Sequence, residues 1–267
     1  MHRIHFGSAR ASGWVFLSLL CAPAFAAEAW VGYERLSREQ LLGRLAEVRD
    51  TAPLTAKNLS AMDLSGVDFR GANLSASVFN SAQLEGAKLD GCNLTVSFFE
   101  GAKLSNASLR NATLFSVQMA GAILNKANLS GARLIGDLRR TDLSNATLTQ
   151  MNAAADMRNQ SMGLMRTNMV NAKAVNADFT DSDFSRADLS FSNFSGAKLI
   201  RTKLVRADFS GSTLTGADLT GADLREAVLI DADFTNANLT NADLTGAEFR
   251  GIKGLDAANR AGARGLP

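Results

Sequence analysis

Residues 207–251 read ADFSG STLTG ADLTG ADLRE AVLID ADFTN ANLTN ADLTG AEFRG, and this stretch decides the fold. A leucine or phenylalanine returns at every fifth residue from Phe209 to Phe249, and an alanine or serine stands two positions before each of them. A helix repeats about every 3.6 residues and a strand about every two, so neither produces this spacing. A fixed short period instead indicates a solenoid, in which each repeat packs only on its neighbours.

The five-residue unit, A-(D/N)-L-x-x, resembles the repeat of the pentapeptide repeat family, and the resemblance covers residues 57–256. It implies an all-β fold, a right-handed quadrilateral parallel β-helix in which four pentads form one coil. At about 4.8 Å per coil, about ten coils would make a rod about 48 Å long. Members of the family have diverse functions, so the fold alone does not identify the activity.

The chemistry of the pentad agrees with this architecture. The leucine or phenylalanine and the small residue two positions earlier are expected to point inward, where the large side chain fills the axis and the small one lets corners approach. The other three positions are mostly Asp, Asn, Ser, Thr, Gly, Lys and Arg, as expected for side chains that face water. A stack of this kind needs a cap at each end.

Residues 1–26 have the pattern of a secretory signal peptide, with a basic start that includes Arg3 and Arg10 and an apolar run over residues 13–22. The small residues around Phe25 predict cleavage after Ala26. The apolar run is shorter than the roughly 20 residues that a membrane span needs, so we expect no membrane span after cleavage. The predicted location is the periplasm or the medium.

The chain that follows Ala26 has a composition that disfavours catalysis. Of the 28 basic residues two precede Ala26, which leaves 26 basic against 26 acidic residues, and both histidines precede it too. Cys92 is the one remaining cysteine, so it has no partner for an internal disulfide. It takes the small position before Leu94 and is expected to be buried and unreactive. We therefore predict no catalytic residue, no metal site, no cofactor and no enzymatic activity.

Residues 27–56 are predicted to cap the first coil. Ser37 opens the sequence SREQ, in which Ser37 and Gln40 form a capping box, and apolar residues follow on one face of a helix that extends to about Arg49. The alternative is that this helix binds a partner. At the other end, residues 257–267 are predicted to form a modest cap or tail, with a short helix over Leu255–Ala263.

The repeat is interrupted once, over residues 135–163. After Leu134 the next leucine is Leu138, four residues on, whereas the thirty residues from Leu134 to Leu164 equal six pentads. A deletion and an insertion therefore compensate, and we expect the segment to stay in the rod as a loop at one corner. Methionine and arginine are frequent in it. Two interpretations remain open, an imperfect coil filled by pliable side chains or a recognition loop on a rigid scaffold.

The predicted function is an exported, non-enzymatic scaffold that binds an unknown protein partner; a homodimer has no specific support. Phe115 and Ile135 take equivalent outward positions in successive coils and are expected to form an exposed apolar stripe beside the interruption. The candidate protein-binding face comprises Phe98, Phe115, Ile123, Ile135, Arg139, Arg140, Arg158, Met162, Met165 and Arg166.

The sequence leaves two other functions open. A carbohydrate-active enzyme or glycan binder would use stacked carboxylates, for which counting in steps of twenty predicts two columns: Asp63 with Asp183, Asp223 and Asp243, and Asp68 with Asp188 and Asp208. The resemblance also implies a DNA-mimic function for some family members, the quinolone-resistance proteins that bind type II topoisomerases through acidic rods. Residues 177–249 carry twelve acidic and six basic side chains, but overall neutrality and predicted export disfavour that function and nucleic-acid binding.

Overall fold

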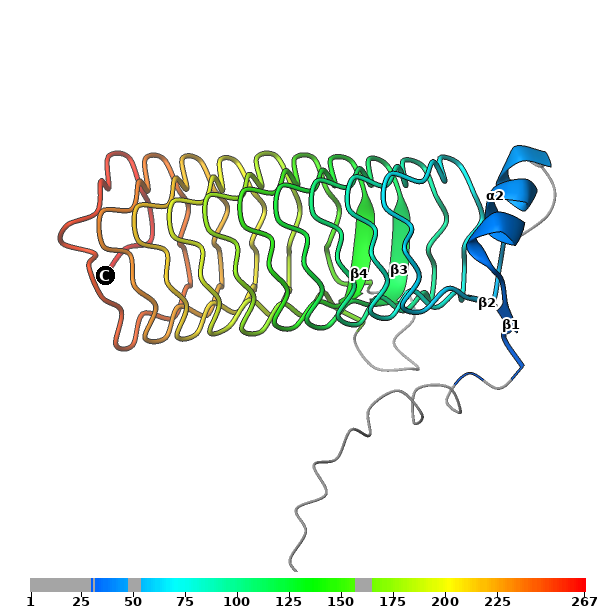
Figure 1. Cartoon of the computed structure of the whole chain (residues 1–267). Coiled ribbons are helices and arrows are strands. Elements are labelled where there is room, and N and C mark those ends of the chain that lie inside the picture. Colours follow the sequence, from blue (N-terminus) through cyan, green and yellow to red (C-terminus); the bar gives the residue numbers. More distant parts are fainter. Residues whose placement is uncertain (1–29, 31, 48–53, 157–164) are drawn as a thin grey trace, which may run out of the picture. The chain divides into compact units, whose positions relative to one another are not determined.

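The computed structural model describes residues 30, 32–47, 54–156 and 165–267. The chain divides into two compact units, Met1–Gly32 and Tyr33–Pro267, and everything below concerns the second. Figure 1 shows the coils of this unit stacked along one axis. The predicted signal peptide lies outside the described residues. Within them, no helix has the length and apolar character needed to cross a bilayer.

Each coil has four sides because backbone bridges join residues that are twenty apart. Asn58 pairs with Val78, Asp63 with Gln83, Asp68 with Lys88 and Asn73 with Asn93, all in parallel. We call the four resulting stacks the first, second, third and fourth ladder in this order. Amides bind carbonyls of the next coil, as when Leu59 N–H donates to Val78 O at 2.8 Å. The fold is a four-sided parallel β-helix.

The pentad sequence explains each side. The leucine or phenylalanine is buried on the axis, as at Leu219, which is 0% exposed. The Asp or Asn before it caps the next turn: Asp218 Oδ1 accepts hydrogen bonds from the Thr220 N–H at 3.0 Å and the Thr220 hydroxyl at 2.5 Å. Gly221, the residue after Thr220, has φ +64° and so lies in the left-handed region. It is the third residue of the four-residue turn from Leu219 to Ala222, where a positive φ favours glycine.

The N-terminal part of this unit contains three short elements. β1 (Glu34–Arg35) pairs in parallel with β2 (Lys57–Asn58), and α2 (Arg38–Glu47) lies between them in sequence. Both bonds of the predicted capping box are present, since Gln40 N–H donates to Ser37 Oγ at 3.1 Å and Ser37 N–H donates to Gln40 Oε1 at 2.8 Å. Leu36 and Leu41 join the buried cluster that fills the axis.

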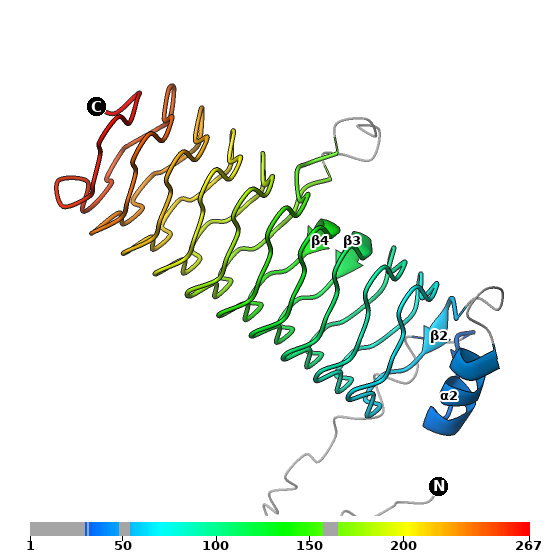
Figure 2. The ribbon, with the colours of Figure 1, turned by 90° about the horizontal axis from the view of Figure 1, so that it is seen from above.

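β3 (Thr113–Gln118) and β4 (Arg133–Asp137) run in parallel across the corner that joins the fourth ladder to the first. Gln118 pairs with Asp137, nineteen residues on, and Asp137 pairs with Asn168, thirty-one residues on. One coil is thus a residue short, and the next has eleven extra residues at the same corner. We call this the irregular corner, comprising β3, β4 and the ends of the insertion at 154–156 and 165–166. Figure 2 shows those ends leaving the coil beside β4.

The one-residue deletion and the eleven-residue insertion together add ten residues, which is two pentads. The five-residue spacing is therefore preserved, but a residue after the insertion lies two ladders away from the ladder that counting in steps of twenty predicts. Asp63 lies in the second ladder, whereas Asp183, Asp223 and Asp243 lie in the fourth. The same displacement separates Asp68, in the third ladder, from Asp188 and Asp208, in the first. The predicted columns hold for Asp183, Asp223 and Asp243 and for Asp188 and Asp208, but Asp63 and Asp68 were assigned to the wrong columns, because counting in twenties assumed that no residues leave the coil. Leu164, used in that count, lies outside the described residues.

The C-terminal segment also differs from the prediction. Residues 255–263 form turns and bridge positions, and no helix is present among them. Asn259 pairs with Asn238 and Arg264 with Asp243, so the ladders continue past the predicted limit at residue 256. The backbone has enough repeat-like geometry to pair here even though the pentad sequence has faded.

Candidate functional site

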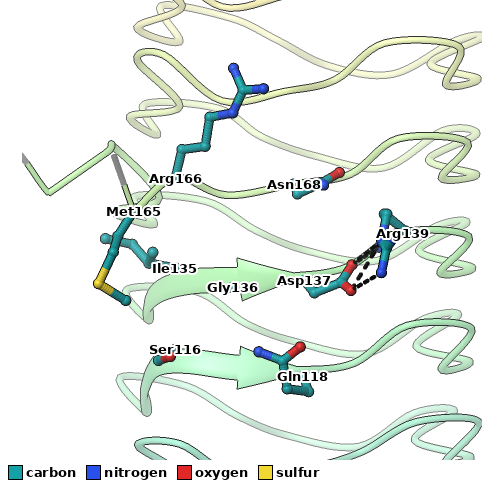
Figure 3. A pocket seen from close by; sticks show the side chains of 9 residues that line it. All are labelled: Ser116, Gln118, Ile135, Gly136, Asp137, Arg139, Met165, Arg166 and Asn168. Carbon is teal, nitrogen blue, oxygen red and sulfur yellow. Dashed lines mark hydrogen bonds and ion pairs between the residues drawn. The ribbon is translucent and has the colours of Figure 1, made fainter. Parts of the chain in front are cut away.

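A hollow of about 310 Å³ opens at the irregular corner (Figure 3). It lies where β3 and β4 replace the usual turns and where the insertion rejoins the coil. The residues that line it come from this corner of three successive coils. They are Ser116, Gln118, Ile135, Gly136, Asp137, Arg139, Met165, Arg166 and Asn168.

Gly136 makes this geometry possible. The shortened coil draws the β4 backbone tightly onto β3, and the register shifts between Phe115 and Val117 as in a β-bulge. A Cβ atom at Gly136 would stand 2.1 Å from the carbonyl oxygen of Val117 and 2.8 Å from its nitrogen. Only glycine fits a backbone approach this close. The floor of the hollow is therefore fixed by main-chain contacts.

The insertion is fastened at its neck. Asp156 N–H donates to Met165 O at 3.0 Å. The Thr167 hydroxyl, fully buried, lies 2.8 Å from Ala153 O and 3.0 Å from Leu134 O, and it can donate to either. These bonds hold the two ends of the insertion together beside the hollow, which Met165 and Arg166 line.

Ile135 is buried rather than exposed, which corrects the predicted apolar stripe. It is 1% exposed and lies outside the cluster that fills the axis. Its side chain points toward Met165 in Figure 3. Phe115 is its register partner on β3 and is half-buried, with the Arg133 guanidinium carbon 5.9 Å from the ring centroid. The shortened coil turns Ile135 beneath the insertion instead of leaving it at an open turn.

Val96 also lies at this corner, although the sequence pattern did not single it out. It precedes Phe115 by one coil at the same corner, and its N–H donates to Phe115 O at 2.8 Å. It is 44% exposed and has φ +58°, a conformation that a β-branched residue rarely adopts. The signal was available, because most pentads have Gly, Asn or another unbranched residue at this position. Phe98, half-buried in the first ladder, pairs with Gln118 of the hollow.

Two arginines frame the hollow, and each is paired with a carboxylate that is more buried than itself. Arg139 Nη2 binds Asp137 Oδ2 at 2.6 Å, with side chains 51% and 18% exposed. Arg166 Nη2 binds Asp188 Oδ2 at 2.9 Å, with 43% and 14%. Burial opposes ionisation of Asp137, but hydrogen bonds from Arg139 outweigh it and hold its pKa below the ordinary value. The positive members of both pairs face the solvent.

The remaining predicted residues lie elsewhere. Ile123 is in the second ladder, 38% exposed, and does not line the hollow. Arg140 is exposed at the turn beyond Arg139. Arg158 and Met162 lie outside the described residues. The structure thus gathers Ile135, Arg139, Met165 and Arg166 around one hollow, with Phe98 and Phe115 beside it.

The carboxylates give little support to acid–base chemistry. Asp188 neighbours Asp208, and Asp223 neighbours Asp243, so adjacent pairs do exist. Hydrogen bonds from Arg225 lower the pKa of Asp223, and those from Thr245 lower that of Asp243, whereas a general acid needs a raised pKa. Burial raises the pKa of the Cys92 thiol to about 12, which keeps it protonated. Among the described residues no cluster of three His, Cys, Asp or Glu side chains could hold a metal ion.

The comparisons with known proteins concern the repeat. The family model described as pentapeptide repeats matches eight copies over residues 58–95, 99–131, 114–150, 164–199, 192–229 and 217–253. No curated protein matches. Among solved structures, HetL, involved in heterocyst differentiation regulation in the cyanobacterium Nostoc sp. strain PCC 7120, is 25% identical, with a TM-score of 0.44 over 85% of this chain and 96% of its own. QnrB1, a plasmid-mediated fluoroquinolone resistance protein, is 21% identical, with a TM-score of 0.45 over 79% and 87%.

Proposed function

Because this chain belongs to the pentapeptide repeat family, we propose that it is an exported, non-enzymatic scaffold that binds another protein through the irregular corner. The observation that carries the proposal is the coincidence, at one corner, of a shortened coil, an insertion and a hollow. Regular coils need none of these features for stability. A rigid backbone that fixes the hollow would lose little conformational entropy on binding.

The surface around the hollow has the composition of an interface. Phe98, Phe115 and Met165 are partly exposed and apolar, Val96 is exposed in a strained conformation, and arginines stand at the rim. Aromatic residues, methionine and arginine are the types enriched where proteins meet. Backbone strain in an exposed bulky residue also concentrates at functional positions.

The other parts of the proposal rest on sequence. Export rests on the signal-peptide pattern of residues 1–26, and the lack of enzymatic activity on the composition after Ala26. We take the rod to be right-handed with about ten coils, as the family resemblance implies. α2 is taken as its N-terminal cap, since Leu41 is fully buried in the axial cluster. Amino-terminal sequencing of the protein recovered from the periplasm would test export directly.

The binding site is tested with a double variant, Phe115→Asp with Met165→Asp. Ile135→Asp is unsuitable because a charge at a buried position would disrupt the corner itself. The matched control is Ile200→Asp, which follows Leu199 as Phe115 follows Leu114 but lies at a regular corner. A photo-crosslinking residue at Gln118 should yield one crosslinked protein species in periplasm. That species should disappear with the double variant and persist with the control. Equal crosslinking in all three proteins would refute the site.

A further inference from the structure

We propose that the segment bound at the irregular corner is acidic and apolar: an extended stretch of a partner protein in which one large apolar side chain enters the hollow and acidic side chains on either side of it meet Arg139 and Arg166. This inference rests on the proposed function and adds the chemistry of the partner. It follows from the charges at the rim, the apolar wall, and the positions of the two arginines.

The most exposed charged groups at the rim are guanidinium groups, although each is paired with a carboxylate and Glu100 lies near enough to Arg139 to raise its pKa. In both ion pairs the guanidinium is about three times as exposed as the carboxylate, 51% against 18% for Arg139 and Asp137, and 43% against 14% for Arg166 and Asp188. Arg166 Nη2 donates to Asp188 Oδ2 at 2.9 Å, and among the described residues this is its one side-chain hydrogen bond. Arg140, also exposed, adds a third positive charge beyond Arg139. Carboxylates and phosphates are the groups whose geometry such guanidinium forks match.

The apolar part of the hollow suits one side chain. Met165, half-buried, supplies the apolar surface that a ligand can touch, since Ile135 in the same wall is only 1% exposed. The volume of about 310 Å³ is at the lower end of the range for ligand pockets, roughly 300–1,000 Å³. It accommodates a leucine, methionine or phenylalanine with room to spare. The thioether of Met165 can adapt to any of these shapes.

The two arginines reach the hollow from different sides. In Figure 3 Arg139 stands beyond Asp137 at one end of β4, and Arg166 stands above Met165 at the other. A ligand that bridges both must therefore carry separate negative charges with its apolar group between them. A single phosphate or sulfate would satisfy one rim only, and a basic segment would meet like charges at both.

Selection from a random, surface-displayed peptide library tests the chemistry without knowledge of the partner. The probe is a nonapeptide library, and the target is the purified chain after Ala26. We expect enrichment of sequences with one large apolar residue flanked by Asp or Glu. Fluorescence anisotropy with a synthetic consensus peptide should then show at least a tenfold weaker affinity for Arg139→Gln and for Arg166→Gln, and weaker binding at higher salt.

The control variant is Arg201→Gln, which removes an exposed arginine paired with Asp181 at 2.7 Å and not among the residues that line the hollow. It should bind the peptide as the unmodified protein does, and unfolding midpoints should show that all variants remain folded. Enrichment of basic or uncharged peptides, no enrichment, or unchanged affinity in both hollow variants would overturn the inference. If Gln118 crosslinking still depends on Phe115 and Met165, the protein-binding function survives that result; if it does not, both proposals fail.

Discussion

Two neighbouring corners of one coil look alike in sequence and are built differently. Ser130-Gly131 follows Leu129 and forms a regular turn, in which Gly131 has φ +70° and Ala132 N–H donates to Leu129 O at 3.0 Å. Ile135-Gly136 follows Leu134 and is extended within β4. Gly131 is needed for its backbone angle, whereas Gly136 is needed because Val117 lies against it. The same dipeptide pattern therefore has two physical causes, and substitutions can separate them.

The largest effect is expected for Gly136→Ala. The added methyl meets main-chain atoms of Val117, which have no freedom to move aside, so unfolding free energy should fall by about 3 kcal/mol. Gly121→Ala at a regular turn meets no atom within 4 Å and bears only the strain of φ +68°, so it should lose about 1 kcal/mol. Urea unfolding of both variants measures the difference. Equal losses would mean that the irregular corner relaxes as easily as a regular one.

The next effect concerns the neck of the insertion. Thr167→Val removes a buried hydroxyl that lies between two carbonyl oxygens, and we expect a loss of about 2 kcal/mol. Thr202→Val removes a buried hydroxyl that donates to Phe179 O alone, at 2.9 Å, in a regular coil, and should lose about 1 kcal/mol. Thermal unfolding compares the pair. A larger loss at Thr202 would contradict the assignment of Thr167 as the fastening of the insertion.

A stabilising substitution at Val96 should separate its effect on stability from its effect on partner binding. Val96→Asn places a residue that tolerates φ +58° and should raise stability by about 1 kcal/mol, and the reverse change, Asn106→Val, should lower it by a similar amount. Crosslinking from Gln118 should weaken in Val96→Asn even though the protein is more stable. Unaltered crosslinking would remove Val96 from the proposed site.

The smallest effect is electrostatic and uses two copies of one motif. Arg70 binds Asp68 at a regular corner as Arg139 binds Asp137 near the hollow, and its hydrogen bonds lower the pKa of Asp68 to about 2. Burial opposes the lowering at both carboxyls, but it is the largest influence at Asp137 and only the second at Asp68. Both folded pKa values lie below the ordinary 3.8, so each pair stabilises the protein above that pH and loses its contribution as the pH falls through the folded pKa.

Carboxylate titration by NMR measures these pKa values. Arg70→Gln and Arg139→Gln should each raise the pKa of the facing aspartate, and the rise should be larger at Asp137, where burial is then unopposed. Stability at neutral pH should change little in either case, because both arginines are exposed and solvent screens their ion pairs. A larger rise at Asp68 would show that the hollow is as well solvated as a regular corner.

The regular coils were predictable because the residues of each pentad specify its local structure. Leu219 fills the axis, Asp218 caps the turn, and Gly221 supplies the positive φ, so one pentad specifies one side of a coil. The one-residue deletion was visible as well, since Leu138 follows Leu134 too early. Arg139, Met165 and Arg166, which the sequence singled out near the interruption, line the hollow, and their role in binding a partner stays a prediction.

Two of the failures share one cause, which is that a repeat count cannot tell residues in the coil from residues outside it. The count kept Asp63 with Asp183 and Asp68 with Asp188, although eleven residues leave the coil between them. It also treated Ile135 as an outward position, because burial beneath the insertion depends on a tertiary contact. Val96 escaped notice because its strain is a backbone property that hydrophobic spacing does not report.

The bridge between Asp156 and Met165 has a practical consequence for engineering. The chain leaves the coil and returns to it at one corner, so the amount of sequence carried between these residues is independent of the stacking on either side. An epitope, a fluorescent domain or a second binding module grafted there would leave every later coil on its present side of the rod. Grafting at any regular turn would have to rebuild that turn first. The irregular corner is thus a natural insertion site for a grafted segment or domain, next to the proposed binding surface.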